Sequence, residues 1–294
     1  LFEGHTSLEV DMEEKMQYWV SMASHFIGEH FDYCKPLLDK DYEGMHPKIR
    51  FVSTQLYLSC HFSSESSLIL LQHGQEWDAE IINRSIIEGV VKYIYMLNGT
   101  EDEVLTKVQE YWDILPSYSA IKRSDRASAL LTTVNEEDSS KWKSIEDLTL
   151  EPSDVDGIRG DTNKQQRKKL EQKWSFSHII QEFGNSQDKR LAPLVHLGYN
   201  FGMSSHLIHK DGDGVAMIWE RCVRTPERQE LVKMAHIART ISDICTFAEV
   251  RTSFLFQYCG EKPTAIENIK EKYSPLFSGL KDVFEEFNKF EYET

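Results

Sequence analysis

The stretch "EWDAEIINRSIIEGVVKYIYML", residues 76–97, decides the fold class, because its apolar residues recur at the three- and four-residue spacing of a helix. Glu80, Arg84 and Glu88 stand four residues apart within it. At about 100° per residue these three charges fall in one arc of about 80°, and Ile87 lies beside the same arc. The sequence therefore predicts a helix that carries a charged stripe on a face suited to burial.

This charged stripe has two interpretations. In a buried position, Arg84 balances only one of the two glutamates, and an unpaired buried carboxylate is very costly. A protonated His209 from another helix would supply the second positive charge, so we hypothesise that the stripe and His209 meet in the core of a bundle. On the surface, the same stripe would be an i,i+4 network that contributes roughly 0.3 kcal/mol per pair.

Helical periodicity continues along most of the chain. Predicted helices cover residues 8–34, 48–74, 76–97, 101–118, 163–174, 175–184, 189–210, 226–258 and 268–290. The first of them stops before Pro36, and Pro226 stands at a first-turn position where proline is favoured. No segment shows the alternation typical of a strand, and no internal repeat is evident. The predicted class is therefore all-α, a helical bundle.

The predicted organisation is one helical domain over residues 1–294. It comprises an N-terminal helix at 8–34, a bundle core at 50–122 and 162–258, an irregular insertion at 123–161, and a C-terminal helical tail at 261–294. The insertion is rich in Ser, Asp, Glu, Gly and Thr, and its few apolar residues offset little of the entropy lost on ordering. We therefore expect a long loop there that does not separate two domains.

The composition restricts the class of protein. Lys and Arg together number 33 and Asp and Glu 48, so the formal net charge of −15 opposes unspecific attraction to nucleic acid or to an anionic membrane. The five cysteines are widely spaced without a C-x-x-C pair, which is typical of a reducing compartment. No apolar run reaches the length of about 20 residues that a membrane span needs, and no signal peptide is recognisable. We expect a cytoplasmic protein that does not enter a membrane.

The stretch "YNFGMSSHLIHKDGDG", residues 199–214, also carries chemistry. Ser205 lies four residues before His209 and His206 three residues before it, so the three side chains share one side of a helix. The glycines of "KDGDG" suit the left-handed backbone with which helices end. The sequence thus places a hydroxyl, two imidazoles and two carboxylates near one helix terminus.

Three interpretations remain open for this terminus. A metal site would combine its two histidines with Asp211 or Asp213, but this spacing is weak evidence and we predict no metal. A catalytic site would use His209 as a general acid or base that Ser205 orients. A structural role would leave the side chains as a cap, where a cationic His is favoured by about 0.3 to 1 kcal/mol. Because the chain has no phosphate-binding Gly loop and no dinucleotide fingerprint, we predict no cofactor.

Three motifs of the chain resemble those of a bacterial family of helical proteins of unknown function. Members of that family show an Arg-Ser-x-x-Glu helix, a Trp-led segment and a Ser-x-x-x-His helix end. In this chain the motifs stand in "AEIINRSIIE", in "WSFSHIIQEFG" and in a Y-x5-S-x3-H pattern, and consist of Arg84, Ser85, Glu88, Trp174, Ser205 and His209. The resemblance covers residues 50–255 and leaves the first helix and the C-terminal tail outside.

That family is similar in layout to the HEPN superfamily, many of whose members are metal-independent ribonucleases of phage-defence and toxin systems. A HEPN site pairs an Arg with a His on one helix at a short spacing and works as a dimer. "RLAPLVH" has such a spacing between Arg190 and His196, although Pro193 between them would kink a helix. The resemblance therefore implies a HEPN-like fold, an RNA substrate and a partner protein encoded nearby. The catalytic residues would be Arg84, Glu88, Ser205 and His209.

The chemistry of metal-free RNA cleavage agrees with part of this set. The reaction needs a base for the 2′-hydroxyl proton and a cation for the phosphorane charge, and His209 and Arg84 are residues of these types. The one basic cluster that could guide RNA is "KQQRKKLEQK", which is otherwise a solvated helix face. The predicted binding residues are Glu80, His206, Lys164, Arg167 and Lys168.

Two hypotheses of function follow. The first is a HEPN-like helical effector that cleaves RNA in a defence or toxin system, and the second is a non-enzymatic helical sensor, scaffold or small-ligand-binding protein in such a system. An enzyme should leave its charged cluster open to a pocket, whereas a scaffold should bury and pair it. Helices 78–97 and 226–258 carry more apolar surface than one bundle covers, so we also expect a homodimer.

Overall fold

The computed structural model describes residues 7–134, 141–160 and 162–292. These residues form helices and no strand, which confirms the all-α class. They group into two compact units, of which unit 1 comprises Leu1–Asn98 and Ile180–Thr294 and unit 2 comprises Gly99–Ile179. No helix within the described ranges combines the length and the apolar character that crossing a membrane requires.

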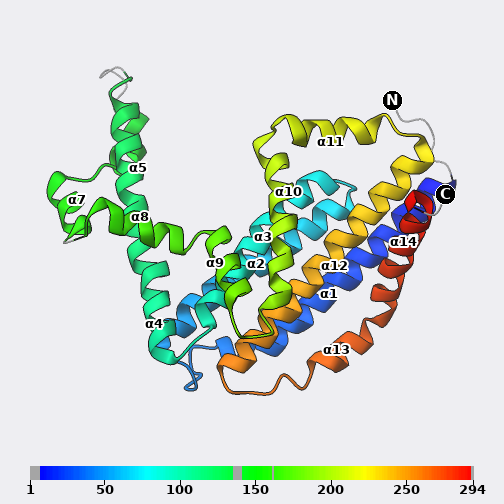
Figure 1. Cartoon of the computed structure of the whole chain (residues 1–294), viewed down its shortest axis with the longest axis horizontal. Coiled ribbons are helices and arrows are strands. Elements are labelled where there is room, and N and C mark those ends of the chain that lie inside the picture. The colour runs from blue at the N-terminus through cyan, green and yellow to red at the C-terminus, as the bar shows by residue number, and fades with distance from the viewer. Residues whose placement is uncertain (1–6, 135–140, 161, 293–294) are drawn as a thin grey trace. The chain divides into compact units, whose positions relative to one another are not determined.

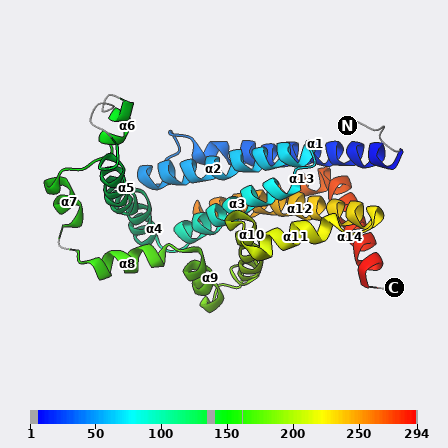
Figure 2. The same cartoon turned by 90° about the horizontal axis from the view of Figure 1, so that it is seen from above.

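Unit 1 is built on four long helices. They are α1 (Ser7–Leu38), α2 (Pro47–Gln72), α3 (Glu76–Leu97) and α12 (Pro226–Tyr258). Helix α1 packs against α2 and α12, and α3 packs against the same two helices, so the four close into a bundle (Figures 1 and 2). Its core is apolar, and the fully buried side chains include Ile27, Ile49, Leu71, Ile86, Ile94 and Ile241. The predicted bundle is therefore present in unit 1.

The turn between α2 and α3 shows how local sequence positions this bundle. Gly74 has a φ of 67°, in the left-handed region that glycine adopts without strain, and its N–H bonds to the carbonyl of Leu71. Helix α3 begins two residues later, so α2 and α3 form an antiparallel hairpin. The predicted position of this turn is confirmed.

Helix α1 differs from its prediction at its end. The helix continues through Pro36 to Leu38, although we expected it to stop before the proline. A proline lacks the N–H that would bond to the carbonyl four residues earlier. Because Pro36 lies in the last turn, this loss affects only the helix end, and the buried side chains of Leu37 and Leu38 keep that turn in the core.

Shorter helices cover the bundle of unit 1. Helix α10 (Leu197–His209) packs on α3 and on α11 (Gly212–Cys222), whereas α14 (Ser274–Tyr292) packs on α12 and α13 (Ile266–Lys272) on α1. Lys210 ends α10 with a left-handed φ of 50°, and the Asp211 carboxylate then accepts the N–H of Gly214 at 3.0 Å to cap α11. The predicted end of the helix at residue 210 is confirmed, whereas α11 was not predicted.

Unit 2 overturns the expectation of an irregular insertion. It contains α4 (Glu101–Gln109), the π-helical turn η1 (Glu110–Ile114), α5 (Leu115–Leu131), α6 (Lys143–Glu146), α7 (Pro152–Arg159) and α8 (Lys164–Lys173). The prediction of a loop over 123–161 is wrong for α5, α6 and α7, while residues 135–140 and 161 lie outside the described residues. A few interactions hold this region in place. Ile121 and Ala127 are buried, and the Ser124 hydroxyl accepts the N–H of Leu150 at 2.8 Å.

Candidate ligand pocket

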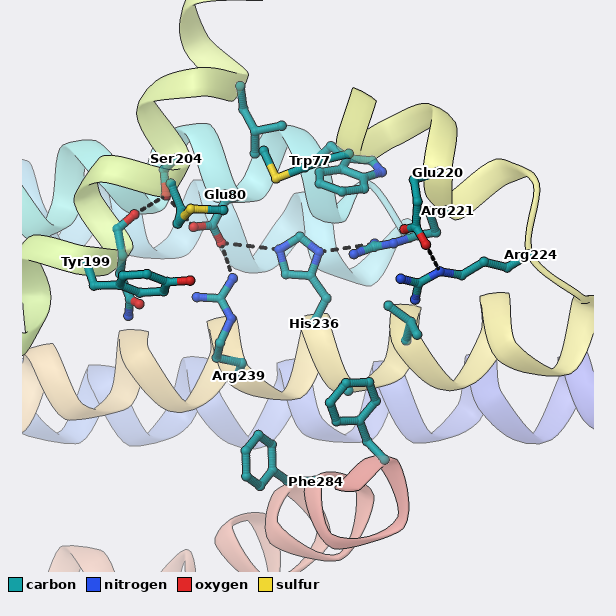
Figure 3. A pocket seen from close by; sticks show the side chains of 17 residues that line it. Trp77, Glu80, Tyr199, Ser204, Glu220, Arg221, Arg224, His236, Arg239 and Phe284 are labelled. Carbon is teal, nitrogen blue, oxygen red and sulfur yellow. Dashed lines mark hydrogen bonds and ion pairs between the residues drawn. The ribbon is translucent and has the colours of Figure 1, made fainter. Parts of the chain in front are cut away.

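Unit 1 contains a cavity of about 380 Å³ whose lining comes from α3, α10, α11, α12 and α14 (Figure 3). Its apolar and aromatic lining includes Trp77, Tyr199, Met203, Leu207, Phe284 and Phe287. Its charged lining comprises Glu80, Glu220, Arg221, Arg224, His236 and Arg239. The volume lies in the range of about 300 to 1,000 Å³ that small-molecule sites occupy.

Glu80 is the most deeply buried acid of this cavity, with 4% of its surface exposed. Its carboxylate accepts hydrogen bonds from the Ser204 hydroxyl, from Nη2 of Arg239 at 2.7 Å and from Nε2 of His236 at 3.3 Å. Burial alone would raise the pKa of Glu80. The bond from His236 and the charge of Arg239 outweigh burial and lower this pKa to about 2, so the carboxylate is ionised at neutral pH.

His236 stands between an acid and a guanidinium (Figure 3). Its Nδ1 lies 3.2 Å from Nη1 of Arg221 and its Nε2 faces Glu80. Because a guanidinium can only donate, Nδ1 must accept, and the ring proton must stand on Nε2 and be donated to Glu80. Burial lowers the pKa of His236, against the opposing effect of Glu80. The imidazole is therefore neutral at pH 7, and both of its nitrogens are engaged.

Arg221 connects this histidine to a second buried acid. Its Nη1 lies 3.0 Å from Oε1 of Glu76, which is 5% exposed, and its guanidinium lies 4.1 Å above the Trp77 ring. The same ring meets the imidazole of His236 edge-on, with 5.2 Å between the ring centroids. Trp77 thus contacts both the Arg221 guanidinium and the His236 imidazole at one end of the cavity.

The remaining arginines of the cavity are also paired. Arg239 bonds to Asp243 at 3.3 Å as well as to Glu80, and Arg224 bonds to Glu220 at 2.6 Å. Burial raises the pKa of Asp243 to about 6, although the charge of Arg239 opposes this shift. Every arginine in the lining therefore already has a carboxylate partner.

The stripe on α3 is arranged differently from our hypothesis. Arg84 is half-buried with its guanidinium 3.9 Å above the Phe201 ring, and no carboxylate among the described residues pairs with it. Glu88 pairs with Lys92 instead. The expected network of Glu80, Arg84 and Glu88 is wrong. Each of the three side chains contacts a different residue outside this set.

The predicted contact between the stripe and His209 is also wrong. His209 is exposed at the end of α10, whereas α10 meets α3 through Ser204 and Phe201. Ser204 lies one position, or about 100°, from Ser205, and this rotation decides which hydroxyl faces Glu80. The two motifs therefore meet in the structure, but not through the residues that we expected.

The other predicted residues lie outside the cavity lining. Nδ1 of His206 lies 2.8 Å from Oδ2 of Asp211 and 3.9 Å from Asp213. Among the described residues no group of three His, Cys, Asp or Glu side chains is arranged to hold a metal ion. The basic cluster Lys164, Arg167 and Lys168 lies on α8 in unit 2, with both lysines exposed.

The HEPN-like spacing of Arg190 and His196 does not correspond to one helix. Arg190 lies in a turn, where its Nε bonds to Asp188 at 2.7 Å, and His196 ends the 3-10 helix η3 (Ala192–His196). Pro193 occurs within this short helix. The pair therefore lacks the shared α-helical face that the HEPN arrangement implies.

We did not predict the polar residues of α12, of which His236 and Arg239 line the cavity. His236, Arg239, Thr240 and Asp243 recur at three- and four-residue intervals in "HIARTISD", between buried apolar positions such as Ile237 and Ile241. This is the same pattern of a polar stripe within an apolar helix that drew attention to α3. Applied to residues 226–258, the same criterion would have found them.

Comparison with known protein families now adds one finding. The chain matches the model of a family described only as a family of unknown function, DUF5677, over residues 50–218, which is more than half of its length. The chain belongs to the DUF5677 family. This confirms the predicted resemblance to a family of unknown function, and the match includes Glu80 and Ser204 but ends before His236 and Arg239. No match was found among curated proteins or among solved structures.

Proposed function

We propose that this DUF5677 protein is a non-enzymatic helical sensor that binds a small, largely apolar organic molecule in the cavity of unit 1. The observation that carries the proposal is the composition of the lining, in which aromatic and aliphatic side chains surround a charged network whose members are already paired. Binding sites for small molecules combine such an apolar lining with a few fixed polar groups.

The pairing within the network argues against acid-base chemistry at this site. The one basic lone pair of His236 stands on Nδ1, where the Arg221 guanidinium already donates to it. Glu80 accepts from four side chains, and its lowered pKa makes it a weak base. The network is therefore suited to holding α3, α10, α11 and α12 in a fixed geometry around a ligand.

The rim of the cavity indicates the chemistry of the ligand. Tyr199 is 74% exposed, Phe284 50% and Met203 38%, so apolar and aromatic side chains are accessible to a ligand at the entrance of the cavity. The Arg239 side chain is 36% exposed and the Glu220 side chain 50%, so each can still contact a polar substituent. A planar apolar body with one or two hydrogen-bonding groups fits this arrangement.

Binding of 8-anilinonaphthalene-1-sulfonate tests the proposal. The wild type should bind one molecule of this fluorescent probe per chain with micromolar affinity. Met203→Trp places a bulky ring at the cavity entrance and should weaken binding at least about tenfold, or about 1.4 kcal/mol. Val215→Trp adds the same ring to α11 at an exposed position outside the lining and should leave the affinity unchanged.

Two results would contradict this proposal. Equal affinity of Met203→Trp and Val215→Trp would place the probe elsewhere, and absence of stoichiometric binding to the wild type would leave the cavity without a ligand. Near-ultraviolet circular dichroism of each variant provides the control for folding. An unchanged spectrum separates a filled cavity from a loosened core.

We propose RNA cleavage by a HEPN-like, metal-independent mechanism as the second candidate function. The observation that favours it is the pair His206 and Asp211 at the end of α10, which lies close in sequence to His209. The hydrogen bond to Asp211 raises the pKa of His206, so its protonated form persists to higher pH and suits a general acid. The predicted base of this reaction is His209, which is exposed at the end of the same helix.

Incubation with labelled RNA in the presence of EDTA tests this second candidate. This candidate predicts cleavage by the wild type that His206→Ala and His209→Ala abolish without change in melting temperature. His73→Ala, which alters an exposed histidine at the end of α2, is the matched control and should remain active. A folded and fully active His209→Ala protein would remove this candidate and leave the sensor.

A further inference from the structure

Arg251 on α12 is a charged side chain in the middle of the bundle of unit 1. It is 0% exposed, and its Nε, Nη1 and Nη2 are all buried without a hydrogen-bond partner in the structure. A guanidinium does not lose its proton in a protein, so the charge remains wherever the side chain is buried. Burial of an unpaired charge is among the costliest arrangements in a protein core.

The surroundings of Arg251 contain no counter-charge from the described residues. Its guanidinium lies 5.1 Å from the centre of the Tyr57 ring, and Tyr57 meets Tyr93 edge-on with 5.9 Å between centroids. A cation–π contact attracts the guanidinium but satisfies none of its five N–H groups. Burial raises the pKa of the nearby Cys34 and Cys60 thiols, so neither supplies a thiolate at neutral pH.

Other buried polar atoms around Arg251 also lack hydrogen-bond partners. The hydroxyl of Tyr93, Nε2 of His30 and Nδ1 of His61 are buried and have no hydrogen bond in the structure. Thr252 connects two residues of this region, because its hydroxyl lies 3.1 Å from Nδ1 of His30 and 3.4 Å from the Tyr57 hydroxyl. Four helices, α1, α2, α3 and α12, thus place polar side chains around Arg251, and no carboxylate of the described residues forms an ion pair with it.

We propose that the core of unit 1 binds a monatomic anion of the halide class at Arg251. A halide supplies the missing negative charge and accepts from the guanidinium and from the Tyr93 hydroxyl. Its small size matters, because Arg251, Tyr57, Tyr93 and His30 are all 0% exposed, so the ion must be enclosed within the bundle as the chain folds, and a monatomic ion needs the least room. This anion would be a structural component of the bundle, separate from the cavity lined by Glu80 and His236.

Thermal unfolding in different sodium salts tests the proposal. At constant sodium concentration, replacing gluconate by chloride should raise the melting temperature of the wild type progressively, because a ligand that binds only the folded state stabilises it by mass action. Arg251→Met removes the charge at similar volume and should abolish this difference between chloride and gluconate. Arg228→Met removes a cation that pairs with Glu291 near the surface, and it should retain the chloride effect.

A direct measurement covers the case in which Arg251→Met does not fold. Crystals of the wild type grown in bromide should show an anomalous scattering peak at the guanidinium of Arg251. Absence of a peak there, or the same melting temperature of the wild type in chloride and in gluconate, would overturn the proposal. A chloride effect that persists in Arg251→Met would also overturn it, since the ion would then act elsewhere.

Discussion

At the scale of single residues, Glu80 shows how a buried carboxylate depends on several helices at once. The side chain starts on α3 and accepts from Ser204 on α10 and from His236 and Arg239 on α12. Each partner contributes a hydrogen bond, while Arg239 also supplies the opposite charge. Removal of the negative charge would weaken the acceptor that Arg239 and the imidazole share.

Glu80→Gln tests this dependence with little change in shape. We expect a loss of about 3 kcal/mol in the free energy of unfolding, at the lower end for a broken buried pair because Arg239 is partly exposed and keeps Asp243. Glu88→Gln is the matched control, since Glu88 pairs with Lys92 on the same helix and should cost under about 0.5 kcal/mol. Urea unfolding measures both, and equal costs would contradict a central role for Glu80.

The pH dependence of stability separates two titrating residues of the cavity. Burial lowers the pKa of His236, so the unfolded chain binds this proton first and stability falls as the pH drops below about 6.5. Asp243 has the opposite sign, because its pKa is raised to about 6 and the folded chain binds its proton first. From pH 7 to about pH 5, His236→Gln should therefore lose stability less steeply than the wild type, and Asp243→Asn more steeply.

Unfolding in urea at several pH values checks these two slopes. The comparison must use the variants, since burial also lowers the pKa of His30 and His61 and adds to the slope of every protein. Parallel curves for the wild type and His236→Gln would show that this imidazole titrates alike in the folded and unfolded chains. That result would contradict its buried, neutral state.

At the scale of elements, the cavity depends on a close approach of α10 and α11. A Cβ added at Gly214 on α11 would lie 2.3 Å from the backbone oxygen of His206 on α10. Backbone atoms cannot turn away as a side chain does, so only glycine permits this approach. It brings Met217, Glu220 and Arg221 of α11 into the cavity lining.

Gly214→Ala should therefore push α11 away from α10. We expect a loss of about 1 to 3 kcal/mol in the free energy of unfolding, as for other overpacked sites, together with weaker binding of the fluorescent probe. Gly212→Ala is the control, because a Cβ there meets nothing within 4 Å and should leave stability unchanged or raise it by about 0.5 kcal/mol. Equal effects of the two substitutions would show that the contact between α10 and α11 is dispensable.

At the scale of the whole molecule, the two units differ in the size of their cores. Most of the fully buried apolar side chains belong to unit 1, whereas the buried set of unit 2 is short and includes Val104, Val108, Tyr118, Ile121 and Trp174. A small core buries less apolar surface and gives a more marginal fold. The prediction of one domain over residues 1–294 remains to be tested by unfolding.

We expect unit 2 to unfold at a lower urea concentration than unit 1. Trp174 in unit 2 and Trp19 in unit 1 are both 4% exposed, so they are matched reporters of the two cores. Labelling with 5-fluorotryptophan and following each resonance by fluorine NMR gives one unfolding curve per unit, with assignment by Trp174→Phe and Trp19→Phe. Coincident curves would support a single cooperative domain instead.

The apolar surface of α3 and α12, from which we expected a homodimer, is buried within unit 1. Helices α3 and α12 bury their apolar side chains inside unit 1, and Ile86, Ile87, Ile241 and Ile244 are all 0% exposed. Their apolar surface therefore requires no second copy of the chain. The homodimer itself stays a prediction, and sedimentation at micromolar concentration distinguishes it from a single species of 34.2 kDa.

The sequence by itself determined the local features of this protein. Apolar spacing specified the helices of the bundle, Gly74 specified the turn between α2 and α3, and Pro226 specified the start of α12. The same spacing identified Glu80 as a charge on a face that the fold buries. These features depend on residues within one or two turns of each other, so a linear reading is sufficient for them.

Only the tertiary structure decided which residues meet Glu80. His236 and Arg239 are 156 and 159 positions away in the chain, and Ser204 instead of the expected His209 makes the contact from α10. A contact between helices depends on how each helix is rotated about its axis, and one residue changes that rotation by about 100°. Packing of all the apolar faces together fixes the rotation, and no short segment contains that information.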